Sequence, residues 1–260
     1  MTALPVERFD TLGLADLTAG AELLTRVDRK YVLSPDQAAA LLDGLDARTL
    51  VLAIDGRRRF QYESVYFDTP DLLSYRQSAL RRRRRCKVRT RSYLDTGGAF
   101  LEVKTRDSRG TTVKDRTPYD PADRDRLTPA ALGFIDQTLA ARGHAALAAA
   151  ELTPTLVTRY RRLTLLPPES GVRVTVDTDL VWNYRRNALA VPGLVILETK
   201  SGSRPCDVDR LLWRAGHRPA AISKYGTGLA ALRGDLPDNK WTRVLKSHFQ
   251  IASKEIPCAA

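Results

Sequence analysis

The 260-residue sequence has few of the residues that build disulfide, zinc or redox centres, with three cysteines and three histidines. Cys86, Cys206 and Cys258 are far apart and odd in number, which fits neither a disulfide framework nor a zinc-ligand pattern. The histidines show no ligand spacing either. This cysteine usage favours a reducing, cytoplasmic setting.

Long apolar runs are also missing. No stretch approaches the roughly 20 apolar residues that span a bilayer, and the N-terminus has no apolar signal-peptide core. The sequence therefore predicts a soluble protein without a membrane segment.

Acidic residues are in short supply, because 30 Asp and Glu stand against 42 Lys and Arg, leaving a net charge of +12. Such an excess fits a polyanionic partner: nucleic acid, an anionic membrane surface or a phosphate chain. Charge alone would put nucleic acid first. The helical and aromatic signatures of the common nucleic-acid modules are missing, however, so nucleic acid is not the expected partner.

Basic residues alternate with other residues in one short segment. Every second position is a cation: Arg85, Lys87, Arg89 and Arg91. In an extended strand these four side chains share one face. Charge alternates again in the segments 102–106, 114–116, 173–179 and 198–200. Five such segments predict several strands that face a common polar space, and a closed barrel with an ionic interior is the most economical way to build one.

Periodicity and turn signals predict an α+β fold in one domain, with an antiparallel sheet and flanking helices. The expected strands are 26–33, 62–67, 82–93, 99–106, 114–119, 155–165, 172–180 and 194–200. Expected helices are 15–25, 35–42, a short helix ending near 77, 128–141, 205–215 and 223–232. Residues 1–232 form the expected domain, and 233–260 a basic, loosely ordered tail.

Eight motifs carry a resemblance to a known family. They are Arg26-Val-Asp-Arg-Lys-Tyr31, Lys87-Val-Arg-Thr-Arg-Ser-Tyr93, Leu101-Glu-Val-Lys104, Lys114-Asp-Arg116, Tyr160-Arg-Arg162, Arg173-Val-Thr-Val-Asp177, Leu197-Glu-Thr-Lys200 and Ser223-Lys-Tyr225. Their order resembles that of VTC domains. These are polyphosphate polymerase domains of the triphosphate tunnel metalloenzyme superfamily, which also includes the CYTH triphosphatases. The resemblance covers roughly residues 22–232.

The resemblance implies an antiparallel barrel whose tunnel, lined by inward-pointing Lys, Arg and Glu, binds ATP or another triphosphate and polyphosphate with Mn²⁺ or Mg²⁺. Many cationic donors suit a phosphate chain, and carboxylates suit a divalent ion. By position, the implied cations are Lys30, Arg89, Arg91, Lys104, Lys114, Arg162, Arg173 and Lys224. Ser223 is the implied hydroxyl contact and Glu198 the main metal ligand. Lys87, Glu102, Arg116 and Lys200 share their faces and are further candidates, Glu102 for the metal.

The chain departs from the family pattern at two positions. Asp28 stands where the first motif usually has Glu, so it either reaches the metal less well or only pairs with a neighbouring cation. Ala221 stands where the eukaryotic polymerases have Lys, which removes one expected phosphate contact. The second change weakens the case for polymerase activity more than the case for phosphate binding.

Three functions stay open on the sequence. The first is metal-dependent transfer of the γ-phosphate of ATP to a growing polyphosphate chain. Metal-dependent hydrolysis of inorganic or organic triphosphates is the second, and a non-catalytic polyphosphate-binding module is the third. Glu102 and Glu198 could also be structural partners of the lysines two places on, and Arg81–Arg84 a solvated face. A one-residue slip would replace Arg162 by Arg161, but the apolar Leu163 and Leu165 favour Arg162 as the inward residue.

Overall fold

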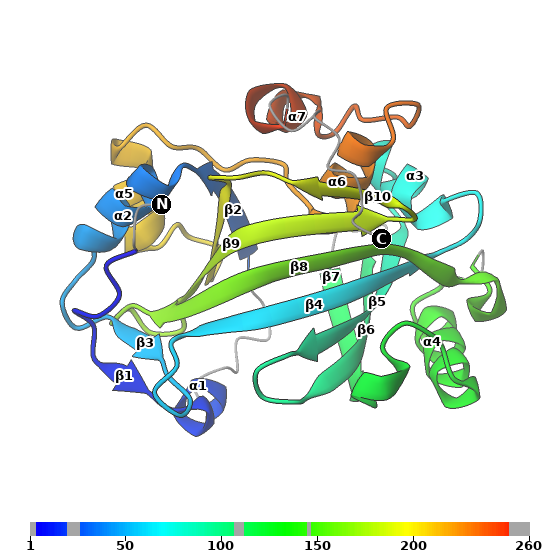
Figure 1. Ribbon diagram of the computed structural model, residues 1–260, viewed down its shortest axis with the longest axis horizontal. Helices are drawn as coiled ribbons and strands as arrows, with labels where there is room; N and C mark the ends of the chain where they lie inside the picture. Colours follow the sequence, from blue (N-terminus) through cyan, green and yellow to red (C-terminus); the bar gives the residue numbers. More distant parts are fainter. Residues whose placement is uncertain (1–3, 20–26, 107–111, 145–146, 250–260) are drawn as a thin grey trace. The chain divides into compact units, whose positions relative to one another are not determined.

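The computed structural model describes residues 4–19, 27–106, 112–144 and 147–249 (Figure 1). Contacts divide the chain into two compact units. Unit 1 consists of Met1–Phe60, Tyr160–Leu180 and Val191–Ile222, and unit 2 of Gln61–Arg159, Val181–Ala190 and Ser223–Ala260. Most of the ladders in both units are antiparallel, so the predicted α+β class is confirmed.

Unit 1 holds a sheet in the order β2-β11-β9-β8, with the short strand β3 beside β8 and β1 beside β3. These strands are β1 (Thr11–Leu12), β2 (Val27–Leu33), β3 (Leu50–Leu52), β8 (Thr153–Leu166), β9 (Arg173–Tyr184) and β11 (Val195–Ser201). Its helices are α1 (Leu14–Ala19), α2 (Pro35–Asp43) and α5 (Asp207–Arg214). The predicted capping box of Ser34 and Gln37 opens α2. Residues 20–25 of the helix predicted over 15–25 lie outside the described ranges.

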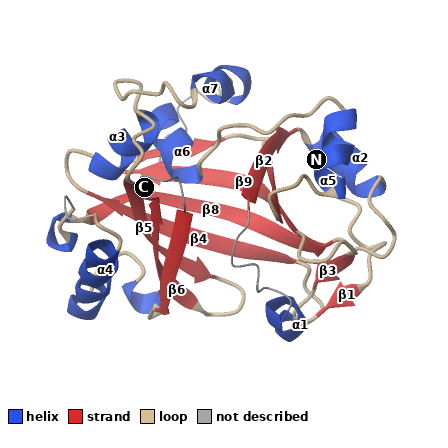
Figure 2. Ribbon diagram, turned by 180° about the vertical axis from the view of Figure 1, so that it is seen from behind, coloured by secondary structure: helices blue, strands red, loops and turns tan. Residues whose placement is uncertain are grey.

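One face of the unit 1 sheet is covered by α2 and α5 (Figures 1 and 2). Leu42 and Leu212 of these helices pack in one apolar cluster with Leu163 and Leu165 of β8. Because side chains alternate along a strand, Arg162 lies on the opposite face. The prediction that Arg162 rather than Arg161 faces the polar side is confirmed.

Unit 2 holds a sheet in the order β8-β4-β5-β6-β7, and strand β10 pairs with the end of β9. Its further strands are β4 (Arg59–Asp68), β5 (Arg85–Tyr93), β6 (Ala99–Arg106), β7 (Thr112–Pro118) and β10 (Asn187–Ala190). The helices are α3 (Leu73–Ala79), α4 (Pro129–Ala141), α6 (Lys224–Leu232) and α7 (Thr242–His248), with 3-10 turns at Pro121–Asp123 and Ala149–Glu151. Helix α4 packs through Ile135 and Leu139 on the apolar face of β5 and β6.

The structure adds elements that the sequence does not predict: β1, β3, β10 and α7. Residues 233–249 are not a loose tail, because they include α7 and the fully buried Trp241. The segment is basic overall, but it also contains a few apolar residues that are buried in the folded protein and hold it in place. Within the described ranges, no helix has the length and hydropathy needed to cross a bilayer.

Candidate functional site

The polar face of strands β5–β7 in unit 2 carries rows of cations in cross-strand register. Directly paired residues of adjacent strands point to the same side of a sheet. The cations of this face are Arg85, Lys87, Arg89, Arg91, Lys104, Arg106, Lys114 and Arg116. The described parts of β5–β7 place one acidic side chain among them, Glu102. The predicted alternation therefore produces one strongly cationic surface.

One row of this face consists of lysines alone. Lys87 stands directly opposite Lys104, and Lys104 directly opposite Lys114 on the next strand. In the neighbouring row, Arg85 stands opposite Arg106. Like charges in direct cross-strand pairs repel one another, and an anion bound over this row would offset that repulsion.

Glu102 binds three of these cations and is almost fully buried, with 3% of its side chain exposed. Arg89 donates from Nε and Nη2 to Oε2 at 2.8 and 2.6 Å. Lys114 Nζ lies 3.3 Å from Oε1, and Arg91 Nη1 lies 3.8 Å from it. Burial alone would raise the pKa of Glu102, but Arg89, Arg91 and Lys114 together hold it well below its usual range. Glu102 therefore stays ionised and fixes the positions of its cations.

Helix α6 brings Ser223 and Lys224 to this cationic face. Ser223 caps the helix by accepting the Gly226 N–H at 3.2 Å, and its hydroxyl also accepts from Lys87 Nζ at 2.9 Å. The side chain predicted as a hydroxyl contact thus lies against one of the predicted cations. Lys224 is partly exposed at the first helical position.

A buried carboxylate outside the predicted site residues holds this helix in place. Asp68 accepts backbone N–H groups of Ser74 and Tyr75 at the start of α3, at 2.8 and 2.9 Å. It also accepts the hydroxyl of Tyr225, whose ring stacks on Tyr66. Helices α3 and α6 lie side by side (Figures 1 and 2). Tyr225 directly follows Ser223 and Lys224, so its hydrogen bond to Asp68 holds the start of α6 in place.

The polar face of unit 1 mixes carboxylates with cations. Glu198 stands opposite Lys30 on β2 and Thr175 on β9. Both Lys30 and Lys200 contact the same oxygen of Glu198, Oε1, at 3.3 and 3.2 Å. Lys200 Nζ also donates to Thr175 Oγ1 at 3.3 Å. The side chain of Glu198 is 13% exposed, so it combines lysine contacts with access from solvent.

The other predicted residues of unit 1 lie on the same face. Asp28 and Arg173 flank Lys200 in register on the two neighbouring strands. Arg173 donates to the carbonyl of Leu17 in α1 at 3.2 Å. Arg162 binds the fully buried Asp177 through two hydrogen bonds, at 2.6 and 2.8 Å. Asp177 is thereby explained as the partner of Arg162.

Lys200 has an unusual electrostatic environment. Burial lowers its pKa to about 8, while Glu198 opposes the shift and Arg162 adds to it. A buried ammonium group among other cations is stabilised by any further anion that reaches it. The environment of Lys200 therefore favours a bound anion on this face.

Carboxylates for a divalent ion are available on unit 1. Asp28 and Glu198 lie on the same face of the adjacent strands β2 and β11. Asp28 pairs with Lys200, two residues after Glu198. Within the residues that the structure describes, no group of three or more His, Cys, Asp or Glu side chains is clustered for a metal. Mg²⁺ is commonly held by one or two carboxylates together with water and substrate phosphates. The oxygen donors present fit an ion of that kind.

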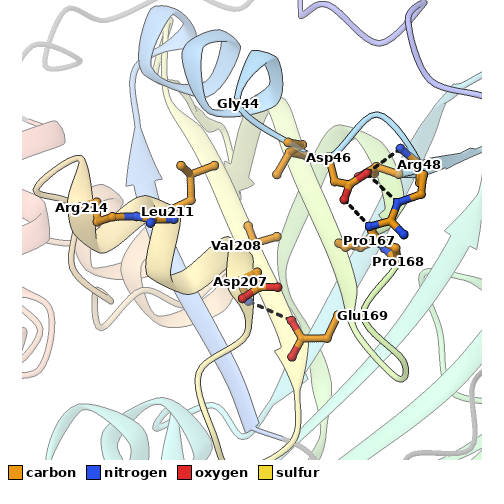
Figure 3. Close-up of a pocket in the computed structure, with 12 residues that line it drawn as sticks. Gly44, Asp46, Arg48, Pro167, Pro168, Glu169, Asp207, Val208, Leu211 and Arg214 are labelled. Atoms are coloured by element: carbon orange, nitrogen blue, oxygen red, sulfur yellow. Dashed lines mark hydrogen bonds and ion pairs between the residues drawn. The ribbon is translucent and has the colours of Figure 1, made fainter.

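A cavity of about 400 Å³ lies elsewhere on unit 1, beside α2 and α5 (Figure 3). Two pairs of its polar lining residues bind each other. Arg48 contacts Asp46 at 2.7 Å, and Glu169 accepts the backbone N–H of Asp207 at 2.9 Å. None of the predicted site residues lines it.

Two cations of the unit 2 face are absent from the residues implied by the family motifs. Arg85 continues the alternation of β5, and Arg106 continues that of β6. The charge alternation in the sequence already placed each of them on the face of its strand's other cations. Tyr66 also belongs to this face, where its hydroxyl accepts from Arg89 at 3.0 Å. No charge pattern marks Tyr66, so only the fold identifies it.

Comparison with known proteins identifies the family. A family model described as the VTC domain matches residues 25–233. The chain belongs to the VTC domain family. The predicted resemblance is confirmed, with bounds close to those expected from the motifs. No protein in a search of curated proteins matches this VTC domain.

Solved structures resemble this VTC domain in fold. HpAC1 from Hippeastrum, described by its dominant triphosphatase activity, is 19% identical, with a TM-score of 0.51 over 82% of this chain and 97% of that one. A candidate adenylate cyclase from Bacillus halodurans is 12% identical, with a TM-score of 0.43 over 91% and 94%. The PH1012 protein from Pyrococcus horikoshii is 12% identical, with a TM-score of 0.39 over 74% and 88%. Of these three, HpAC1 has a TM-score above 0.5, and its likeness together with the family match supports the predicted triphosphate tunnel fold for this VTC domain.

Proposed function

We propose that this VTC domain is a metal-dependent polyphosphate polymerase, which transfers the γ-phosphate of ATP to a growing polyphosphate chain. The observation that carries the proposal is the row of Lys87, Lys104 and Lys114 in direct register. A polyanion bound over this row would offset the repulsion between its lysines. Arg89 and Arg91 add guanidinium groups that suit bidentate phosphate contacts.

The second part of the proposal is a divalent ion, Mn²⁺ or Mg²⁺, held by Glu198 with Asp28. When bound, the ion would neutralise phosphate charge and orient the reacting oxygens. Glu102 is a weaker metal candidate, because Arg89 and Lys114 contact its two oxygens. Its proposed role is to hold the phosphate-binding cations in place.

The chemistry needs no nucleophilic side chain. A terminal oxygen of the acceptor chain attacks the γ-phosphorus of ATP, the bond to the bridging oxygen of the β-phosphate breaks, and ADP leaves with that oxygen. Phosphoryl transfer depends mainly on positioning and charge stabilisation. Lys87, Arg89 and Lys114 supply this charge on a rigid strand surface, and Ser223 orients Lys87 through its hydrogen bond.

Metal-dependent triphosphate hydrolysis is the second candidate. Two observations favour it: Ala221 removes a lysine found in eukaryotic polymerases of the family, and the structurally similar HpAC1 is described as a triphosphatase. Hydrolysis uses the same cations and metal ligands, with water in place of the acceptor phosphate. A non-catalytic polyphosphate-binding module would need only the cations and not the metal ligands.

A product assay with purified protein, ATP and Mn²⁺ separates these functions. It follows ADP, free phosphate and long-chain polyphosphate in one reaction. ADP with polyphosphate and little free phosphate is the expected result. Free phosphate without chains would replace the polymerase by a triphosphatase. Tight polyphosphate binding without turnover would leave a binding module.

A further inference from the structure

Four consecutive arginines form the turn between α3 and β5, which we name the arginine turn. They are Arg81, Arg82, Arg83 and Arg84, and all four are exposed. The preceding Leu80 is exposed as well, at 49%. The proposed transfer chemistry uses none of these side chains.

The backbone of the arginine turn is fixed and carries conformational strain. The N–H of Arg82 donates to the carbonyl of Gln77 at 2.8 Å, and that of Arg81 to Ser78 at 3.3 Å. These two bonds form a Schellman motif at the end of α3. Arg81 occupies its left-handed position, with φ of 54°, where glycine is the usual residue. An arginine here costs stability that glycine would not.

The arginine turn leads directly into the cation rows of β5. Arg85 begins the strand, and its Nη1 donates to the carbonyl of Arg82 at 2.7 Å. From Arg85 to Arg91 the strand extends about 20 Å, which is already longer than three linked phosphoryl groups. Each step toward the turn passes another row of like charges, first Lys87 with Lys104 and then Arg85 with Arg106. Cations therefore continue beyond the length of a triphosphate.

We infer that the arginine turn binds the part of a long polyphosphate chain that extends beyond the cation rows of β5–β7. This inference rests on the proposed function and deepens it. A triphosphate is too short to use the turn, so the turn distinguishes long chains from short ones. It raises the affinity for long polyphosphate without contributing to the transfer step.

The composition around the turn favours a phosphate chain over nucleic acid. Proteins that bind single-stranded nucleic acid combine cations with aromatic side chains on which bases stack. Between Tyr75 and Tyr93 the sequence contains no aromatic residue. The turn therefore offers charge without a stacking surface.

Binding measurements with two ligands test the inference. The affinities for inorganic triphosphate and for long-chain polyphosphate are measured for the wild-type chain and for a variant with Arg81→Gln, Arg82→Gln, Arg83→Gln and Arg84→Gln together. We expect about tenfold weaker binding of long polyphosphate and a shallower salt dependence, since fewer counterions are displaced. Triphosphate affinity and ATP turnover should stay unchanged.

A matched pair of glycine variants removes the effect of strain. Arg81 and Arg185 are both exposed and both have positive φ, 54° and 55°. Arg185 lies in the hairpin of β9 and β10, which packs against α6. Both Arg81→Gly and Arg185→Gly should raise the thermal midpoint, and only Arg81→Gly should weaken binding of long polyphosphate, about threefold.

The outcomes separate the inference from the proposed function. A wild-type chain that binds neither ligand would overturn both. Normal binding of both ligands, with no selective loss in the four-residue variant, would overturn the inference alone. Equal competition by single-stranded RNA, lost in the same variant, would make the turn a nucleic-acid contact and would also overturn it.

Discussion

Two tetrapeptides of this VTC domain share one pattern and have different surroundings. Leu101-Glu-Val-Lys104 lies on β6 in unit 2, and Leu197-Glu-Thr-Lys200 on β11 in unit 1. In unit 2, cations contact both oxygens of Glu102, and Lys104 points to solvent. In unit 1, Lys200 and Lys30 both contact Oε1 of Glu198.

The difference extends to the whole of each face. Strands β5–β7 place eight cations around Glu102, whereas the described face of unit 1 holds four cations with three carboxylates. The latter are Lys30, Arg162, Arg173 and Lys200 with Asp28, Asp177 and Glu198. The excess of cations in unit 2 suits a phosphate chain. The nearly equal numbers of cations and carboxylates in unit 1 suit a divalent ion. Identical local patterns therefore do not imply identical roles.

The largest expected effect comes from exchanging the two glutamates for glutamine. Glu198→Gln should lower metal-dependent turnover by more than about 100-fold, because the main carboxylate for the metal is lost. Binding of polyphosphate should persist or tighten. Glu102→Gln is the matched comparison and should keep the metal dependence. Metal titrations of turnover distinguish the two, and equal turnover of Glu198→Gln and wild type would contradict the metal assignment.

A packing variant should destabilise unit 2. A Cβ atom on Gly226 of α6 would lie 2.1 Å from the buried ring of Trp241. Gly226→Ala should therefore lower the free energy of unfolding by about 1–3 kcal/mol, as overpacked substitutions do. Urea unfolding measures it. Gly133→Ala in α4 is the control, because nothing lies within 4 Å of its added Cβ, and it should gain about 0.5–1 kcal/mol. Equal effects would contradict the close packing of α6.

Removing the central lysine of the row should change binding and stability in opposite directions. Lys104→Gln should weaken triphosphate binding about tenfold, or about 1.4 kcal/mol. Relief of repulsion from Lys87 and Lys114 should raise the free energy of unfolding by about 0.2–1 kcal/mol. Calorimetry and urea unfolding measure the two effects. Lys246→Gln, exposed on α7, is the control. A fall in stability together with binding would indicate that the row is structural.

The smallest effect concerns acid stability. Although burial opposes it, Arg89 and its neighbours hold the pKa of Glu102 below the ordinary value of 4.5. The unfolded chain then binds more protons than the folded one, so this stabilisation is present above pH 4.5 and is lost on acidification. Wild type should lose more stability than Glu102→Gln between roughly pH 5 and 3. Parallel losses in urea unfolding would contradict this.

Sequence patterns predicted the strands well because charge alternation has the period of a strand. The strand 99–106 is found with its predicted ends, and Cys86 faces the apolar core as alternation requires. The end of the chain was predicted poorly. Trp241, Val244 and Phe249 are too few for a clear helical period in so short a segment, and their burial depends on residues distant in sequence.

The sequence by itself determined which side chains share a face and which family the motifs resemble, since both follow from local spacing and order. Only the tertiary structure decided that Lys87, Lys104 and Lys114 form one row, because register depends on pairing between strands. It also decided the difference between Glu102 and Glu198. The cations around each glutamate come from neighbouring strands, and the local pattern around the two is the same.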